Sequence, residues 1–117
     1  MVSSHEQLRV WNTAMDLAVE VYRLSSHFPK SELYRMTSQL TRAASSVPAN
    51  IAEGNGRGSA RDYARFLSIA KGSLNETETF IRLAIRLGYL TEEQAKAALG
   101  LSNQVGRMLT SLRARLV

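Results

Sequence analysis

The chain has 117 residues, which is enough for one domain with a single core, and its 44% hydrophobic and 21% charged residues are typical of a globular protein. It has no cysteine, which excludes disulfides, thiolate metal sites and cysteine nucleophiles. The formal net charge of +5 favours acidic partners such as nucleic acid or an anionic membrane surface, although it serves solubility equally well.

No uncharged run approaches the ~20 residues that a membrane span requires. The first residues also lack the basic segment followed by an apolar stretch that marks a secretory signal. We therefore expect a cytoplasmic protein with no membrane partner.

The first predicted helix covers residues 8–26 and ends at Phe28-Pro29, because a residue before proline is pushed out of the helical region. It carries two apolar rows with a spacing of three or four. One row is Leu8, Trp11, Met15, Ala18 and Tyr22, and the other is Val10, Ala14, Leu17, Val21 and Leu24. Two rows predict two neighbours for this helix.

The second predicted helix covers residues 30–53, with an apolar seam that includes Leu33, Leu40 and Val47. Pro48 lies inside this pattern, lacks an N–H group and crowds the carbonyl of Ala44, so we predict a kink there. We assign structural roles at this end of the helix to Pro48, Asn50, Glu53 and Gly54.

The third and fourth helices are predicted at residues 60–87 and 92–115. Ser59 and Asp62 resemble a capping box, Gly88 is a good stop, and Thr91 caps the last helix. Short turns make successive helices antiparallel, so the predicted fold is an all-α, up-down-up-down four-helix bundle formed by residues 1–117 as a single domain. Spare apolar rows on the first and third helices predict self-association, with interface candidates Val10, Leu17, Phe66, Ile69, Phe80 and Leu83.

The polar residues do not form a pattern that predicts catalysis or a cofactor. Neither His5 nor His27 follows a glutamate by three residues, as a di-iron bundle requires, so we expect no metal. Glu53, Glu76 and Glu78 have no catalytic partners at helical spacing, so we expect no enzyme activity.

The glycine-rich segment 54–58 lacks the strand and the Lys-Ser/Thr pair of a nucleotide-binding loop. Two interpretations stay open for it: a plain turn, or an anion site in which Arg57 and Arg61 flank a helix N-terminus.

Cations also recur on one side of the third predicted helix, and a second polar stripe on the second helix leads toward Arg57. These stripes predict contacts to nucleic-acid phosphates by Arg35, Arg42, Arg57, Arg61, Arg65, Arg82 and Arg86. The alternative is an ordinary solvated helix face.

Several of these segments resemble one family. The quoted residues are Thr37-Ser-Gln-Leu-Thr-Arg-Ala-Ala-Ser-Ser-Val-Pro-Ala-Asn-Ile-Ala-Glu-Gly54, Gly56-Arg57, Ser59 and Phe66-Leu-Ser-Ile-Ala-Lys-Gly-Ser-Leu-Asn-Glu76. They are similar to the four-helix-bundle proteins encoded within bacterial 23S rRNA intervening sequences, over about residues 8–89.

The resemblance implies a basic homopentamer. It extends to the accessory protein of diversity-generating retroelements, a similar pentamer associated with nucleic acid and a reverse transcriptase. Three positions depart from the family pattern: Thr41 precedes Arg42 where arginines are often paired, and Thr77 and Phe80 replace Leu and Gln. We therefore predict a non-enzymatic homo-oligomer that binds structured RNA or DNA; the alternative is a scaffold that binds a protein partner and no nucleic acid.

Overall fold

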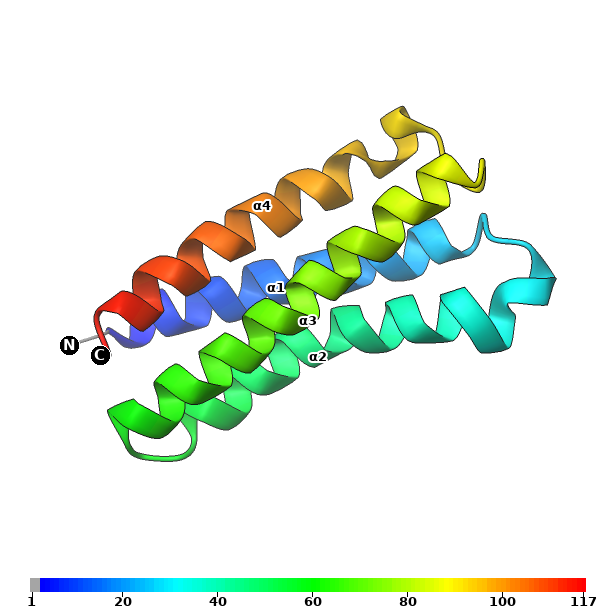
Figure 1. The fold of residues 1–117 in the computed structure, drawn as a ribbon. Coiled ribbons are helices and arrows are strands. Elements are labelled where there is room, and N and C mark those ends of the chain that lie inside the picture. The colour runs from blue at the N-terminus through cyan, green and yellow to red at the C-terminus, as the bar shows by residue number, and fades with distance from the viewer. Residues whose placement is uncertain (1–2) are drawn as a thin grey trace.

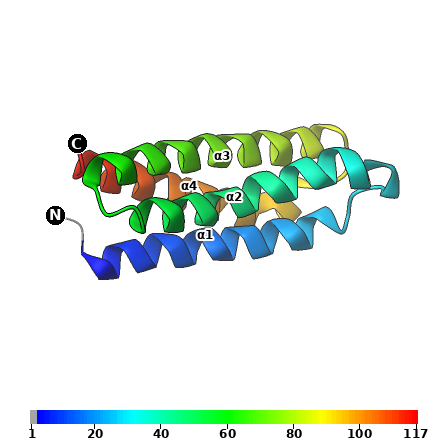
Figure 2. The same cartoon turned by 90° about the horizontal axis from the view of Figure 1, so that it is seen from below.

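The computed structural model describes residues 3–117 as four long helices. Figures 1 and 2 show them side by side in an elongated bundle that measures 44 × 25 × 18 Å. The helices are α1 (Ser4–Ser25), α2 (Ser38–Asn55), α3 (Ala60–Arg86) and α4 (Glu92–Ala114), and two short helical turns, η1 (Lys30–Glu32) and η2 (Leu33–Thr37), precede α2. The predicted all-α bundle is confirmed; its predicted domain of residues 1–117 also includes residues 1 and 2, which lie outside the described part.

Each helix packs against two others, because α1 and α3 both contact α2 and α4. This order places both chain ends and the α2–α3 turn at one end of the bundle (Figure 1). No helix within residues 3–117 combines the length and the apolar character that crossing a bilayer demands.

Polar side chains cap the helix starts and explain where the helices begin. The Glu6 N–H donates to Ser3 Oγ at 3.2 Å, so α1 begins earlier than the predicted residue 8. Ser59 caps α3 in the same way, and Thr91 and Gln94 form a reciprocal capping box at α4.

A glycine ends α3. The N–H of Tyr89 donates to the Ala84 carbonyl at 2.9 Å, and the N–H of Gly88 donates to the Ile85 carbonyl at 3.0 Å. This reversal needs a positive φ, and Gly88 supplies one of 80°. The helix consequently ends at Arg86, one residue before the predicted end.

The irregular part of the second predicted helix, residues 30–53, lies before α2 and not inside it. Arg35, in the π-helical turn η2, has a non-helical φ of −121° and ψ of −106°. Glu32 supports this turn, because its carboxylate accepts from the Met36 N–H and from the Tyr89 hydroxyl at 2.7 Å. The sequence placed the kink at Pro48, but the α-helix of α2 continues through this buried residue.

Most residues of the predicted apolar seams form the core, but Leu33, which lies in η2, is 52% exposed, and the row of Leu8 on α1 faces outward. Six large side chains, contributed by all four helices, are fully buried: Leu17, Leu40, Ile51, Leu67, Ile81 and Leu109. Thr77 is also fully buried, and its hydroxyl donates to the Ser73 carbonyl at 2.8 Å. This buried hydroxyl therefore has the hydrogen-bond partner that a polar group in a core requires.

Candidate nucleic-acid interface

The net charge of the protein lies in one half of the bundle. Side-chain contacts between Glu6 and Arg115, and between Ser46 and Ser73, show which residues of neighbouring segments lie at the same height along the bundle axis. We define the basic half as residues 3–14, 46–73 and 107–117, which contain both chain ends and the α2–α3 turn. This half holds eight cations, Arg9, Arg57, Arg61, Arg65, Lys71, Arg107, Arg113 and Arg115, against three acids, Glu6, Glu53 and Asp62. The other half holds seven cations and seven acids, so the formal charge of +5 belongs to the basic half.

Three arginines surround the α2–α3 turn, and we call Arg57, Arg61 and Arg65 the arginine cluster. The guanidinium carbons of Arg57 and Arg65 lie 5.0 and 4.5 Å from the centroid of the Phe66 ring. Phe66 is only 8% exposed, so two cations cover one aromatic ring. Such cation–π contacts hold a guanidinium in place while its outer N–H groups stay free for phosphate.

Acidic side chains form ion pairs with the same two arginines. Arg57 Nε lies 3.3 Å from Glu53, and Arg65 Nε lies 3.8 Å from Asp62. Both pairs are exposed and join residues only three or four apart in the sequence, so each adds little stability. Their effect is to orient the guanidinium groups, because each carboxylate lies beside the Nε atom of its arginine.

Farther along α3, cations bridge α3 and α4. Arg113 Nε donates to Ser68 Oγ at 2.6 Å, and Lys71 Nζ donates to Thr110 Oγ1 at 2.7 Å. These contacts place further positive charge on the groove between the two helices.

The groove between α1 and α4 also carries cations. Arg9, Arg107 and Arg115 line one hollow there, and Glu6 forms an ion pair with Arg115. The hydrogen bond from Arg115 lowers the pKa of Glu6 below its ordinary value. Positive charge therefore surrounds the basic half on several of its faces.

The structure separates the seven arginines predicted to bind nucleic acid. Arg57, Arg61 and Arg65 come together at the α2–α3 turn. Arg82 and Arg86 lie near the other end of α3, where Arg82 pairs with Glu78 at 3.1 Å. Arg35 lies on η2, and Arg42 lines a hollow beside Glu76 in the α2–α3 groove. Four of the seven thus lie in the half where acids balance cations.

Sequence reasoning missed five cations of the basic half: Arg9, Lys71, Arg107, Arg113 and Arg115. They lie on α1, on α3, and on or directly after α4, and belong to no single stripe. Antiparallel helices bring particular helix ends together at each end of the bundle. Adding the charges of the helix ends that meet would have detected these five cations.

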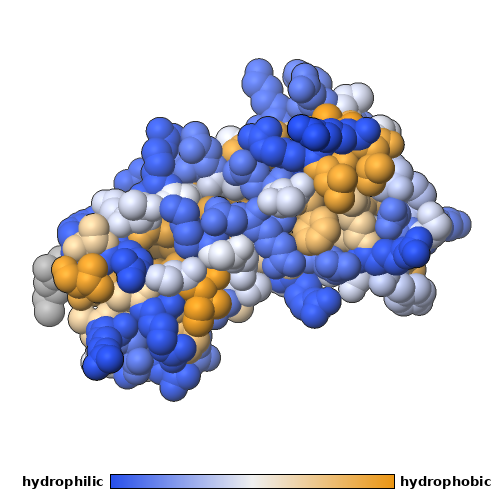
Figure 3. Space-filling model, viewed as in Figure 1, coloured by the Kyte–Doolittle hydropathy of each residue, from blue (hydrophilic) through white to orange (hydrophobic). Residues whose placement is uncertain are grey.

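The predicted subunit-interface residues divide in the structure. Val10 and Leu17 are buried in the core of the single chain, so they offer no surface to another copy. Phe66 lies beneath the arginine cluster. Ile69 and Leu83 are 41% and 40% exposed, and Phe80 is half-buried. Figure 3 shows apolar surface gathered over the C-terminal part of α3, within a largely hydrophilic face.

On α1 the row of Leu8, and not that of Val10, faces outward. We call Leu8, Met15, Val19 and Tyr22 the α1 apolar row; Leu8 and Tyr22 are 58% and 56% exposed. The exposed residues of the neighbouring α2 include a row of small ones, Ser38, Ser45, Ala49 and Ala52, which we call the small-residue face and which Arg42 borders. Small side chains let a second helix approach closely.

The residues assigned structural roles lie where α2 meets α3. Asn50 Nδ2 donates to the Ser46 carbonyl at 2.8 Å and to Ser46 Oγ, which lies 2.9 Å from Ser73 Oγ. Gly54 packs directly on Phe66, and Glu53 pairs with Arg57. Within residues 3–117, no three His, Cys, Asp or Glu side chains converge closely enough to hold a metal ion.

The fold and the charge distribution define an arginine-rich antiparallel four-helix bundle. Residues 6–111 match the family model of the 23S rRNA-intervening sequence protein, and the chain belongs to this family. It is also similar to a protein of unknown function from the S23 ribosomal protein family of Bacteroides thetaiotaomicron, known from a crystal structure. The two chains are 28% identical and superpose with a TM-score of 0.85 over 93% of this chain and 98% of the other. No curated protein matched the chain.

Proposed function

We propose that the protein is a non-enzymatic, basic homo-oligomer that binds structured RNA or DNA through phosphate contacts. The observation that carries the proposal is the excess of eight cations over three acids in the basic half. A field of one sign attracts a polyanion over long range and raises its association rate.

The side chains of the basic half favour phosphate contacts over base reading. Seven of its eight cations are arginines, whose planar fork matches two phosphate oxygens. Phe66 and Tyr63 are buried there, and the third aromatic ring of the basic half, Trp11, is half-buried, so no row of open rings is available on which successive unpaired bases could stack. The proposed ligand is therefore a duplex or another folded nucleic acid.

Apolar surface supports the homo-oligomeric part of the proposal. The α1 apolar row lies on one side of the small-residue face of α2, and the exposed residues Ile69 and Leu83 of α3 lie on the other. Apolar surface of this extent is usually covered by a partner. The pentameric state comes from the family resemblance, and light scattering after size-exclusion chromatography measures it directly.

A salt titration tests the nucleic-acid ligand. Fluorescence anisotropy with a labelled RNA hairpin would give the dissociation constant at about 50 and 200 mM salt. If about three phosphates are contacted, affinity falls about fortyfold between these concentrations, because each contact contributes about 0.9 to the logarithmic slope. The absence of measurable binding at the lower concentration would refute the proposal.

The α1 apolar row also favours a second candidate, a scaffold that binds a protein partner. In that case a purified complex keeps its partner after nuclease treatment, and Tyr22→Glu releases it because Tyr22 is largely exposed. Loss of the partner on nuclease treatment alone would exclude this candidate.

A further inference from the structure

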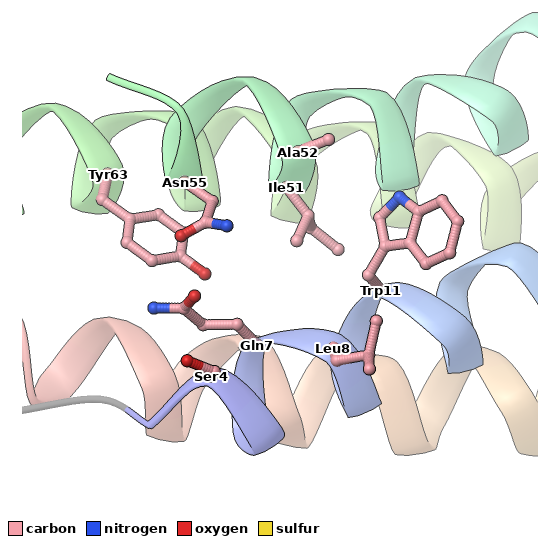
Figure 4. Close-up of a pocket in the computed structure, with 8 residues that line it drawn as sticks. All are labelled: Ser4, Gln7, Leu8, Trp11, Ile51, Ala52, Asn55 and Tyr63. Atoms are coloured by element: carbon pink, nitrogen blue, oxygen red, sulfur yellow. The ribbon is translucent and has the colours of Figure 1, made fainter. Parts of the chain in front are cut away.

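A hollow between α1 and α2 lies within the basic half of the bundle, away from the arginine cluster, and takes no part in the proposed phosphate contacts. Its volume is about 510 Å³, within the range of small-molecule sites in proteins. Three helices supply its lining, which Figure 4 shows: Ser4, Gln7, Leu8 and Trp11 from α1, Ile51, Ala52 and Asn55 from α2, and Tyr63 from α3.

The lining separates an apolar part from a polar end. Leu8, Trp11 and Ile51 form one side, while the amides of Gln7 and Asn55 lie close to the Tyr63 hydroxyl (Figure 4). The eight lining residues include none with a charged side chain. A ligand that fits this hollow is therefore neutral, with an apolar body and a polar group at one end.

Tyr63 makes the polar end unusual. The residue is only 5% exposed, and its hydroxyl has no hydrogen-bond partner in the described structure. Burial raises the pKa of this phenol above its ordinary value of 10.0, so the hydroxyl keeps its proton and remains a donor. Most buried polar atoms in proteins have a partner, and an unsatisfied one calls for an acceptor.

We propose that this hollow binds a neutral small molecule that combines an aromatic or aliphatic body with a carbonyl oxygen, such as an aryl amide. The body packs against Leu8, Trp11 and Ile51, and the carbonyl oxygen accepts the hydrogen bond of Tyr63. No residue of the arginine cluster lines the hollow. The site is therefore separate from the phosphate contacts, and either of these two proposals can fail without the other. It shares Leu8 with the α1 apolar row and Ala52 with the small-residue face of α2, so the ligand is tested on dilute, dissociated protein.

The chain carries its own reporter for this site. Trp11 is the only tryptophan of the sequence and lies in the wall of the hollow. Acetanilide, a neutral aryl amide, is the probe, and excitation near 295 nm selects the emission of Trp11. We expect a saturable change in emission with a dissociation constant in about the millimolar range, as is usual for a ligand of this size.

Three variants separate the site from a non-specific effect. Ala52→Leu places a larger side chain in the hollow from an exposed position on α2 and should abolish the saturable change. Tyr63→Phe keeps the ring but removes the donor, and should weaken binding about fivefold. Tyr89→Phe removes a hydroxyl that donates to Glu32 near the far end of the bundle, and should leave binding unchanged.

The proposal is overturned if acetanilide causes no saturable change, or if Ala52→Leu and Tyr63→Phe bind it like the parent protein. A second copy of the chain is the other possible occupant. In that case Trp11 emission changes with protein concentration while acetanilide has no effect on dilute protein, and this result would also overturn the proposal.

Discussion

Gly54 and Phe66 pack so closely at the α2–α3 turn that a Cβ on residue 54 would lie 2.7 Å from Phe66 Cβ. The missing side chain lets the two helices approach at this end. It also fixes the position of the Phe66 ring, on which Arg57 and Arg65 lie. One glycine therefore supports both the packing of the bundle and the arginine cluster.

Gly54→Ala should destabilise the protein by about 1–3 kcal/mol, because the added methyl group overlaps Phe66 and the backbone of Tyr63. Gly72→Ala is the matched control: this helical position has open space around it, and alanine should stabilise the helix by up to about 1 kcal/mol. Urea unfolding of both variants gives the two free energies. Equal stabilisation by both substitutions would contradict the tight contact.

Two hypotheses for RNA binding give different predictions: binding by the basic half, or binding by all the arginines along α3. The double variant Arg61→Glu/Arg65→Glu should abolish binding at moderate salt, whereas Arg82→Glu/Arg86→Glu should weaken it little, because the latter pair lies in the half with balanced charge. Both doubles change the net charge equally, so anisotropy titrations compare position alone. Equal losses in the two variants would show that the whole of α3 contributes to binding.

The helices themselves were largely predictable, because their caps are local. Ser59, Thr91 and Gly88 end or begin helices through hydrogen bonds within a few residues. The earlier start of α1 carried the same kind of signal, since Ser3 and Glu6 have the spacing of a capping box.

The irregular segment before α2 had no such local signal. Glu32 supports it by accepting a hydrogen bond from Tyr89, which lies beyond α3 in the sequence. A proline draws attention in a sequence because its effect is local. The tertiary contact that accompanies the break at Arg35 is visible only once the helices are packed.

The candidate site was only partly predictable for a similar reason. Arg57, Arg61 and Arg65 are near one another in the sequence and were found together. Arg9 and Arg113 join them in the basic half only because antiparallel packing brings the start of α1 and the end of α4 beside the α2–α3 turn. Periodicity within one helix cannot reveal a charge excess that several helices share.

Periodicity also could not decide which apolar row of α1 faces the core, and the structure now gives a sharp test of self-association. Met15→Glu alters an exposed position of the α1 apolar row and should dissociate the assembly while helicity remains. Leu17→Glu, two residues along, buries a charge in the core and should unfold the chain. Light scattering measures the mass and circular dichroism the helicity. A Met15→Glu protein of unchanged mass would place the interface elsewhere.

Two tyrosines should respond oppositely to loss of their hydroxyl at neutral pH. Tyr63→Phe removes a buried donor without a partner and should stabilise the ligand-free protein by about 1 kcal/mol. Tyr89→Phe removes the hydrogen bond to Glu32 and should destabilise it. Thermal unfolding of both variants tests the contrast. A less stable Tyr63→Phe protein would mean that its hydroxyl has a partner in solution.

The same two tyrosines should make the protein less stable in alkali. Burial raises the pKa of Tyr63, and the hydrogen bond to Glu32 raises the pKa of Tyr89, both from an ordinary value of 10.0. As pH rises through about 10, the unfolded chain therefore loses these protons before the folded chain does, and the free energy of unfolding decreases until the pH exceeds the folded-state pKa values. Urea unfolding at pH 8, 9, 10 and 11 should show this decrease, and a Tyr63→Phe/Tyr89→Phe double variant should show a smaller one. An equal decrease in the double variant would assign the alkaline loss of stability to other groups, such as lysines.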